Sequence, residues 1–262
     1  MTLLQLAVLA LVQGITEFLP ISSSGHLILT SQVLDWPDQG LAVDVAVHAG
    51  TLLAVIVYFW RDIIRILGGL TESGSASTRP LAGMIVVATI PAGAAGYALH
   101  AIDENMFRDP AVIAWATLGF GLLLLVADLF GMTLRRLEHM TWTAAIMIGL
   151  AQILSLIPGT SRSGITMTAA RFMGFERDAA ARFSLLLSIP LISAATLLKG
   201  LDVYEASDVE LSRSMLIAGF LAFLSAIVAI WLMMAWLKRA TFTPFVIYRI
   251  ALGLGLLAWI YI

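Results

Sequence analysis

The chain contains no cysteine and little charge. Without cysteine, its 262 residues can form no disulfide, no thiolate nucleophile and no thiolate metal site. Charged residues make up 12% of the sequence, whereas ~25% is typical of soluble domains, so they cannot cover a globule with a solvated surface. Lysine and arginine number 15 against 17 acidic residues, and this balance excludes nucleic acid as an expected partner. With 60% hydrophobic residues, the chain is predicted to be a polytopic membrane protein.

Long apolar runs set the predicted architecture. A helix needs ~20 apolar residues to cross the ~30 Å hydrocarbon core of a bilayer. Stretches that reach about this length are predicted to cross, and they comprise residues 41–60, 81–102, 111–132, 179–199, 214–237 and 244–262. The expected fold class is therefore an all-α polytopic membrane protein, with one integral membrane domain over residues 1–262.

Two further apolar regions, 3–34 and 141–173, are each interrupted by a proline and a cluster of serine, threonine and glycine. Their second arms, 25–34 and 164–173, are too short to cross a bilayer at ~1.5 Å per residue. We expect two re-entrant helical hairpins. Each must be buried in protein or line a cavity, because its loop backbone would be unsatisfied in lipid.

The positive charges predict the orientation. If the hairpins return to their starting side and the six stretches cross, one side of the membrane collects Arg61, Arg65, Arg79, Arg135, Arg136, Arg171, Arg177, Arg182, Lys238 and Arg239. The other side receives only Arg108, Lys199 and Arg213. By the positive-inside rule the crowded side is cytoplasmic, so both termini and the acidic loops are expected outside.

The sequence also contains an internal duplication. Residues 110–123 resemble 244–257 at a constant offset of about 134 residues, and 13–25 resemble 152–164. Each half, about 1–134 and 135–262, would hold one hairpin and three crossings. Three is odd, so the halves should have inverted topology, and the hairpin tips should meet near the membrane midplane.

The first hairpin carries a polar motif. Gln13 and Glu17 are spaced i and i+4, which places them on one helix face. Pro20 is expected to end that helix, and the run Ser22-Ser23-Ser24-Gly25 should open the next with capping hydroxyls and free backbone N–H groups. A helix N-terminus rich in serine and glycine is suited to bind an anion.

The second hairpin repeats this pattern with Thr160, Ser161, Ser163 and Gly164, and Arg162 adds a planar guanidinium suited to bidentate phosphate binding. Ionisable groups within a membrane are costly, so Glu17, His26 and Arg162 are functional candidates. Each alone could be structural: a protonated packing carboxyl, a satisfied histidine or a snorkelling arginine. Their placement on two loops that should face each other favours one shared site.

Three more residues are weaker candidates. Asp44 and His48, again at i and i+4, could support the site, although Asp44 lies close to a predicted membrane surface. Arg249 sits early in the last predicted span.

These motifs resemble a known family. Gln-x-x-x-Glu-Phe-Leu-Pro-x-Ser-Ser-Ser-Gly-His, followed by Pro-Gly-Thr-Ser-Arg-Ser-Gly, is similar to the bacterial undecaprenyl-diphosphate phosphatases, also called bacitracin resistance proteins. The likeness extends over nearly the whole chain. It implies hydrolysis of undecaprenyl diphosphate to the monophosphate that carries cell-wall precursors, with a divalent cation, Mg²⁺ or Ca²⁺. It also implies the bacterial cytoplasmic membrane, with a site open to the periplasmic side.

The resemblance suggests a role for each candidate. Glu17, with Gln13, would hold the metal, although Gln13 is the uncharged choice at a position where the family also has glutamate. Arg162 would bind phosphate, and the loops would donate hydrogen bonds through Ser22, Ser24, Gly25, Thr160, Ser161, Ser163 and Gly164. His26 would be the general acid/base or the nucleophile, Ser23 is the rival nucleophile, and water is the third possibility.

Two other functions would also use serine, glycine, histidine and arginine in a membrane protein. Type-2 phosphatidic acid phosphatases need a downstream His-x-x-x-Asp, but no histidine follows Arg162. A transporter or flippase of a polyprenyl phosphate lipid stays open, because inverted repeats and broken helices are typical of alternating access. Such a protein would leave the diphosphate intact. The expected partners are the lipid substrate and membrane lipids, and small-residue helix faces would permit a homodimer.

Overall fold

The computed structural model describes residues 2–34, 36, 40–69, 79–102, 107, 109–204 and 209–262, and these are almost entirely helical. The α-helices are α1 (Leu3–Thr16), α2 (Ser23–Val33), α3 (Gly40–Tyr58), α4 (Trp60–Gly68), α5 (Arg79–Ile102), α6 (Pro110–Phe130), α7 (Trp142–Gln152), α8 (Arg162–Phe172), α9 (Arg177–Tyr204), α10 (Val209–Leu237) and α11 (Thr243–Tyr261). Two 3₁₀ turns, Leu137–His139 and Ile153–Leu156, flank α7. The predicted all-α fold class is confirmed.

Six of these helices, α3, α5, α6, α9, α10 and α11, are long and apolar enough to cross a membrane, and they cover the six predicted spans. Their outward faces carry large apolar side chains that are more than half exposed. Examples are Trp115, Phe220, Trp231, Leu254 and Trp259. An apolar surface of this extent suits lipid rather than water, so the chain is a multi-pass membrane protein.

The end of the first span differs from the prediction. Helix α3 stops at Tyr58, and after a non-helical Phe59 (φ −99°, ψ 18°) a separate helix α4 begins at Trp60. The Arg61 guanidinium lies over the Trp60 ring at 5.2 Å, and the Arg65 side chain is exposed while Ile66 is buried. This amphipathic pattern is typical of a helix that lies along a membrane surface. Trp60 extends the apolar run, which hid the break from the sequence.

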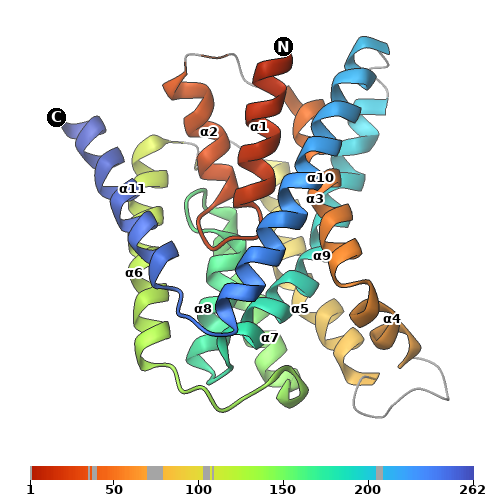
Figure 1. Ribbon diagram of the computed structural model, residues 1–262, viewed down its shortest axis with the longest axis vertical. Coiled ribbons are helices and arrows are strands. Elements are labelled where there is room, and N and C mark those ends of the chain that lie inside the picture. The colour runs from red at the N-terminus through yellow and green to blue at the C-terminus, as the bar shows by residue number, and fades with distance from the viewer. Residues whose placement is uncertain are drawn as a thin grey trace.

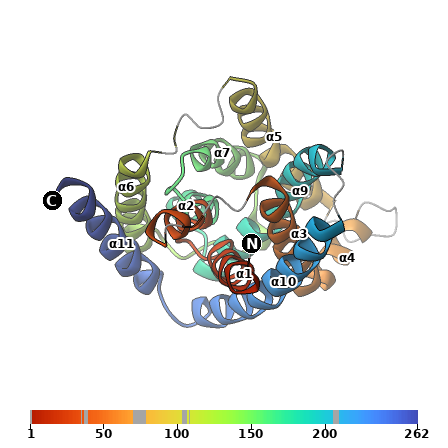
Figure 2. The same cartoon turned by 90° about the horizontal axis from the view of Figure 1, so that it is seen from above.

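The two hairpins have the short second arms that were expected. Helices α2 and α8 each have 11 residues, about 16 Å at 1.5 Å per residue, which is too short to cross. Figure 1 shows α1 starting at the end of the molecule that holds both termini, and α7 starting near the opposite end. Figure 2 shows α2 near the centre of the molecule, α1 beside α10, and α7 between α6 and α5.

The first arm ends earlier than predicted. Helix α1 stops at Thr16 with Glu17 as its C-cap, and residues 17–21 form the turn, so Pro20 lies beyond the helix. A proline disfavours helical geometry at the residue before it, which moves the helix end upstream. Glu17 therefore lies on the loop side of the arm.

The arms pack closely on long helices. Helix α1 lies against α10 and α7 against α5. A Cβ at Gly14 would lie 1.8 Å from Ser225 Oγ, and a Cβ at Gly149 would lie 2.5 Å from the Ala88 carbonyl oxygen. Both contacts require glycine, so these two positions allow each arm to pack closely on its long helix.

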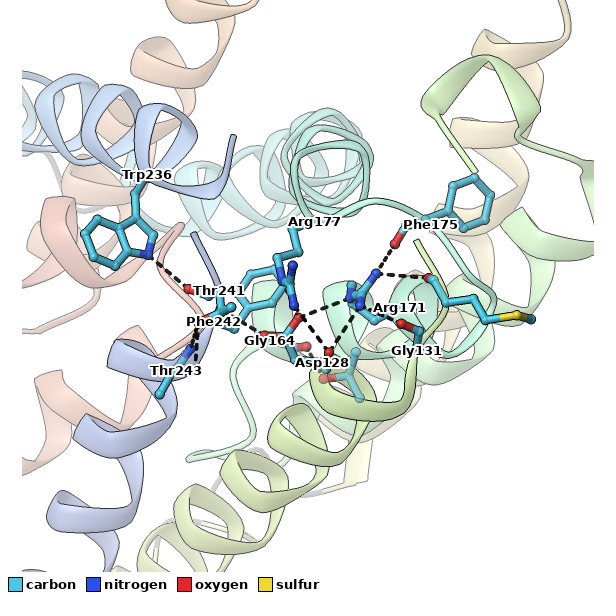
Figure 3. Close-up of polar contacts among 12 residues, drawn as sticks. Asp128, Gly131, Gly164, Arg171, Phe175, Arg177, Trp236, Thr241, Phe242 and Thr243 are labelled. Carbon is cyan, nitrogen blue, oxygen red and sulfur yellow. Dashed lines mark hydrogen bonds and ion pairs between the residues drawn. The ribbon is translucent and has the colours of Figure 1, made fainter. Parts of the chain in front are cut away.

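A buried ionic cluster anchors the base of the second hairpin (Figure 3). Asp128, at the end of α6, accepts hydrogen bonds at Oδ1 from Arg171 Nε (3.3 Å) and Arg177 Nε (2.6 Å). Its Oδ2 accepts from the Phe242 backbone N–H at 3.0 Å. Arg171 is fully buried and donates further to the carbonyls of Gly131, Met132 and Phe175. The cluster joins α6, α8, α9 and the start of α11. Asp128 was not among the sequence candidates, although an acidic residue inside an apolar run indicates a buried polar interaction.

Candidate active site

Glu17 is the centre of a buried hydrogen-bond network. Its Oε2 accepts from Gln13 Nε2 at 2.8 Å and from Ser23 Oγ at 2.7 Å. Its Oε1 accepts from Arg162 Nη2 at 2.9 Å. The Glu17 side chain is only 7% exposed and that of Arg162 11%, so this is a shielded ion pair with charge-assisted hydrogen bonds. Four of the sequence-predicted residues thus meet at one carboxylate.

The loops of the two hairpins touch directly. The Gly159 N–H donates to Ser22 Oγ at 3.1 Å, and Ser163 Oγ donates to the Leu19 carbonyl at 2.9 Å. With the pair between Arg162 and Glu17, three polar contacts connect segments more than a hundred residues apart. The site is therefore assembled from both hairpins.

Both loops enter their second helix in the same unusual conformation. Ser22 and Ser161 are the N-caps of α2 and α8, with φ of 74° and 70°. Each hydroxyl accepts from the backbone N–H three residues on, Gly25 at 3.4 Å and Gly164 at 3.1 Å. A non-glycine residue at such a φ costs about 1–3 kcal/mol and tends to occur at functional sites. In Ser24, which opens α2 with Ser23, the side chain lies outside the described part of the structure.

Several buried polar atoms at the site lack a protein partner within the described residues. Two are donors, Arg162 Nη1 and Thr160 Oγ1, and one is an acceptor, Gln13 Oε1. Buried polar groups are nearly always hydrogen-bonded, so unpaired ones call for a ligand. The two donors suit an anion such as phosphate, whereas the Gln13 oxygen suits a cation or another donor.

His26 is held beside the loop rather than in the carboxylate network. Its Nδ1 lies 2.6 Å from the Ser22 carbonyl oxygen, and its Nε2 lies 2.6 Å from the Tyr248 hydroxyl of α11. The His26 and Tyr248 rings are stacked, with centroids 5.6 Å apart and planes 12° apart. Both ring nitrogens are thus engaged. Tyr248 was not among the sequence candidates, because no local pattern marks a tyrosine that meets a histidine 222 residues away.

His48 lies beside Glu17. Its Nε2 is 3.9 Å from Glu17 Oε2, and its Nδ1 is 2.7 Å from the Asp44 backbone carbonyl oxygen. Beside it, a cavity of about 130 Å³ is lined by Asp44, His48, Thr196 and Lys199, among others. His48 thus contacts the network through Glu17, while Asp44 orients His48 through its backbone.

Arg249 joins the two loops from behind. It is fully buried in α11, and its guanidinium donates at 2.9 Å to the carbonyls of both Gly159 and Thr160 and at 3.1 Å to that of Thr117. Longer contacts of 3.4 Å reach the carbonyls of Pro20 and Ala116. A Cβ on Gly164 would lie 2.9 Å from Arg249 Nη1, so that glycine leaves room for the guanidinium. Arg249 was only a weaker candidate for the site in the sequence, because a cation that binds backbone carbonyls has no partner that a sequence motif can reveal.

The oxygen ligands for a cation are few. The described residues contain no group of three or more histidine, cysteine, aspartate and glutamate side chains that could hold a metal. Gln13 Oε1 is unpaired, and the Glu17 carboxylate has one lone-pair position beyond its three hydrogen bonds. Mg²⁺ commonly binds one or two protein oxygens while phosphate oxygens and water complete its shell. The residues present fit that shared mode.

The family follows from comparison with known proteins. The family model for the bacitracin resistance protein BacA matches residues 6–255. The chain belongs to this family. It is 51% identical over 266 residues to an undecaprenyl-diphosphatase of Hahella chejuensis and 50% identical over 270 residues to one of Roseobacter denitrificans, covering 100% of each chain in both cases. An undecaprenyl-diphosphatase 1 of Rhodospirillum rubrum is 49% identical over 272 residues, which cover 100% of this chain and 96% of its own. The resemblance seen in the two motifs is confirmed.

Proposed function

We propose that this BacA-family chain is a membrane phosphatase that hydrolyses undecaprenyl diphosphate to undecaprenyl phosphate and inorganic phosphate. Full-length relatives at about half identity are named for this activity. The observation that carries the proposal is the buried Glu17 carboxylate, which accepts hydrogen bonds from both Ser23 and Arg162. This arrangement supports the combination of a hydroxyl nucleophile, a base and a phosphate-binding cation in one shielded site.

The anion-binding part of the site comes mainly from the second hairpin. The unpaired Arg162 Nη1 and Thr160 Oγ1 are donors for the terminal phosphate, and the first turn of α8 adds backbone N–H groups. In phosphoryl transfer the developing charge spreads over the equatorial oxygens, so preorganised donors contribute mainly by neutralising it.

Ser23 is the nucleophile that the geometry favours. Its hydroxyl already donates to Glu17 Oε2 at 2.7 Å, the arrangement of a nucleophile with its general base. As the Oγ–P bond forms and the bridging P–O bond breaks, the hydroxyl proton passes to Glu17 and from it to the departing undecaprenyl phosphate. Glu17, again a carboxylate, then takes a proton from the water that attacks the phosphoserine. It returns this proton to Ser23 Oγ as the Oγ–P bond breaks, so inorganic phosphate and free Ser23 result. His26 is less favoured as nucleophile, because both of its nitrogens are engaged.

A divalent cation, Mg²⁺ or Ca²⁺, belongs to the proposal. Gln13 through its free Oε1 and Glu17 through its carboxylate would hold it together with the diphosphate. When bound, it would neutralise phosphate charge and polarise the phosphorus centre.

The proposed setting is the bacterial inner membrane, with the site opening to the periplasmic side. The charge bias supports the orientation of the chain with both termini outside, and the periplasmic opening of the site rests on the resemblance to the family. Inverted repeats are proposed as well. In their favour, the loops share the Ser22 and Ser161 conformation, and α1 packs on α10 as α7 packs on α5.

The test is phosphate release from undecaprenyl diphosphate by the detergent-purified protein, with and without a chelator. Wild type is compared with Glu17→Ala, Arg162→Ala and His26→Ala, and with Arg136→Ala as a control in an exposed pair with Glu176. We expect release that depends on metal, falls at least ~100-fold in the three site variants and is unchanged in the control. A folded wild type that releases no phosphate would overturn the enzyme and favour a transporter of the same lipid.

A further inference from the structure

Helix α11 contributes two adjacent side chains, Tyr248 and Arg249, to the hairpin loops. We propose that Tyr248 is a positioning residue that donates to His26 Nε2 and holds the imidazole in one orientation. The proposal rests on the proposed function, in which loss of His26 is expected to lower phosphate release. Among the described residues, the polar and ring contacts that connect Tyr248 to the site are those with His26.

The tautomer follows from the hydrogen-bond partners. A backbone carbonyl can only accept, so the 2.6 Å contact with the Ser22 oxygen requires a proton on His26 Nδ1. In the neutral ring Nε2 then has a free lone pair, and the Tyr248 hydroxyl at 2.6 Å must be its donor. Tyr248 therefore stabilises the form of His26 whose Nε2 can accept a proton.

The ring orientation is restrained as well. The imidazole of His26 stacks on the phenol of Tyr248 with planes 12° apart, which opposes rotation about its side-chain bonds. His26 lies one turn after Ser23 on α2, so its ring is on the helix face of the proposed nucleophile.

The backbone that carries Tyr248 is itself fixed. The next residue, Arg249, is fully buried and donates to the carbonyls of Pro20 in the first loop and Gly159 in the second. The Tyr248 hydroxyl is therefore held at a set distance from the loop that begins α2. Such preorganisation is what a catalytic acid or base requires.

The first experiment measures the chemical shifts of the two His26 ring nitrogens, which report their protonation and hydrogen bonding. Protein labelled with ¹⁵N-histidine is compared by NMR as wild type and Tyr248→Phe, with His26→Gln to identify the His26 signals among the four histidines. We expect the proton on Nδ1 in both proteins, because the Ser22 carbonyl remains its acceptor. In Tyr248→Phe we expect the Nε2 signal to shift to that of an unprotonated nitrogen that accepts no hydrogen bond. Unchanged His26 nitrogen shifts in Tyr248→Phe would overturn the proposal. This readout needs no activity, so it stands apart from the test of the phosphatase.

The second experiment is a double-mutant cycle on phosphate release. Tyr248→Phe keeps the ring and removes the hydroxyl, so we expect kcat to fall about 10-fold with KM within about twofold. The double variant Tyr248→Phe with His26→Gln should be no slower than His26→Gln alone, because Tyr248 acts through His26. Tyr261→Phe, an exposed tyrosine on the same helix, is the matched control. Additive losses, or an unchanged kcat in Tyr248→Phe, would overturn the role in catalysis.

Discussion

The Arg162 guanidinium donates to Glu17 Oε1 at 2.9 Å and joins residues 145 positions apart in sequence. The two residues belong to different hairpins, so neither hairpin alone contains the site. Because Arg162 uses one nitrogen on Glu17 and keeps Nη1 unpaired, it can bind the carboxylate and a phosphate at the same time. This double use requires a forked side chain.

Arg162→Lys should therefore fail despite keeping the charge. A single ammonium cannot span both partners in the geometry of the guanidinium, so we expect kcat/KM for undecaprenyl diphosphate to fall at least ~100-fold. Steady-state kinetics on detergent-purified protein measure this. Arg136→Lys, which changes an exposed arginine, should have wild-type kinetics. Near-normal activity in Arg162→Lys would show that charge alone is enough.

Ser23→Ala separates a nucleophile from a binding group. As nucleophile, Ser23 is required for every turnover, and its loss should lower phosphate release by more than ~1000-fold. Substrate labelled with ³²P in the terminal phosphate should label wild-type protein transiently on rapid acid quenching. Mass spectrometry should place that label on Ser23. Loss of only about tenfold, without any labelled protein, would assign the attack to water.

Arg249→Met should prevent stable folding. The substitution removes the buried donor to the Thr160 carbonyl, leaves the Gly159 carbonyl only a 3.4 Å contact from Thr117 Oγ1, and removes the second donor of the Thr117 carbonyl. A buried acceptor without a donor costs about 1–3 kcal/mol. We expect little monodisperse protein after detergent extraction, as size-exclusion chromatography would show. Arg249→Lys supplies fewer donors and should be intermediate in yield. Wild-type yield of Arg249→Met would mean that the loops hold together without this residue.

Asp128→Asn should lower stability more than activity per folded molecule. It leaves Arg171 buried and Arg177 partly buried without their carboxylate, and removing one partner of a buried pair costs about 3–5 kcal/mol. For a chain of this size that corresponds to a Tm lower by roughly 10 °C. Differential scanning fluorimetry in detergent measures it, with Glu176→Gln, a change at a partly exposed carboxylate, as control. A Tm within about 2 °C of wild type would contradict the anchoring role of the cluster.

The sequence predicted the membrane-spanning segments of this molecule well, because a single physical constraint, the length of apolar sequence, determines them. Apolar length determines which segments cross a bilayer, so the six spans were readable. The break between α3 and α4 could not be predicted from the sequence, because Trp60 continues the apolar run and only backbone geometry marks the end of the span.

The candidate site was predictable where its residues share a local motif. Gln13 and Glu17 were recognised by their spacing, and their side chains do form a hydrogen bond. The contributions of Tyr248 and Arg249 could not be recognised in this way. Tyr248 contacts a histidine from a distant segment, and Arg249 donates to backbone carbonyls from distant segments. Backbone acceptors leave no trace in sequence.

Because Arg249 lies in the last helix and donates to carbonyls of both loops, it also sets the order in which the site assembles during synthesis. A ribosome makes both hairpin motifs well before it reaches Arg249, which follows Gly159 by 90 residues. Until α11 is inserted, Glu17 and Arg162 can be present in the membrane while the carbonyls around them have no common donor. A nascent chain halted before α11 should thus carry both signature motifs and yet have no catalytic geometry, so maturation of this protein is completed by its last helix.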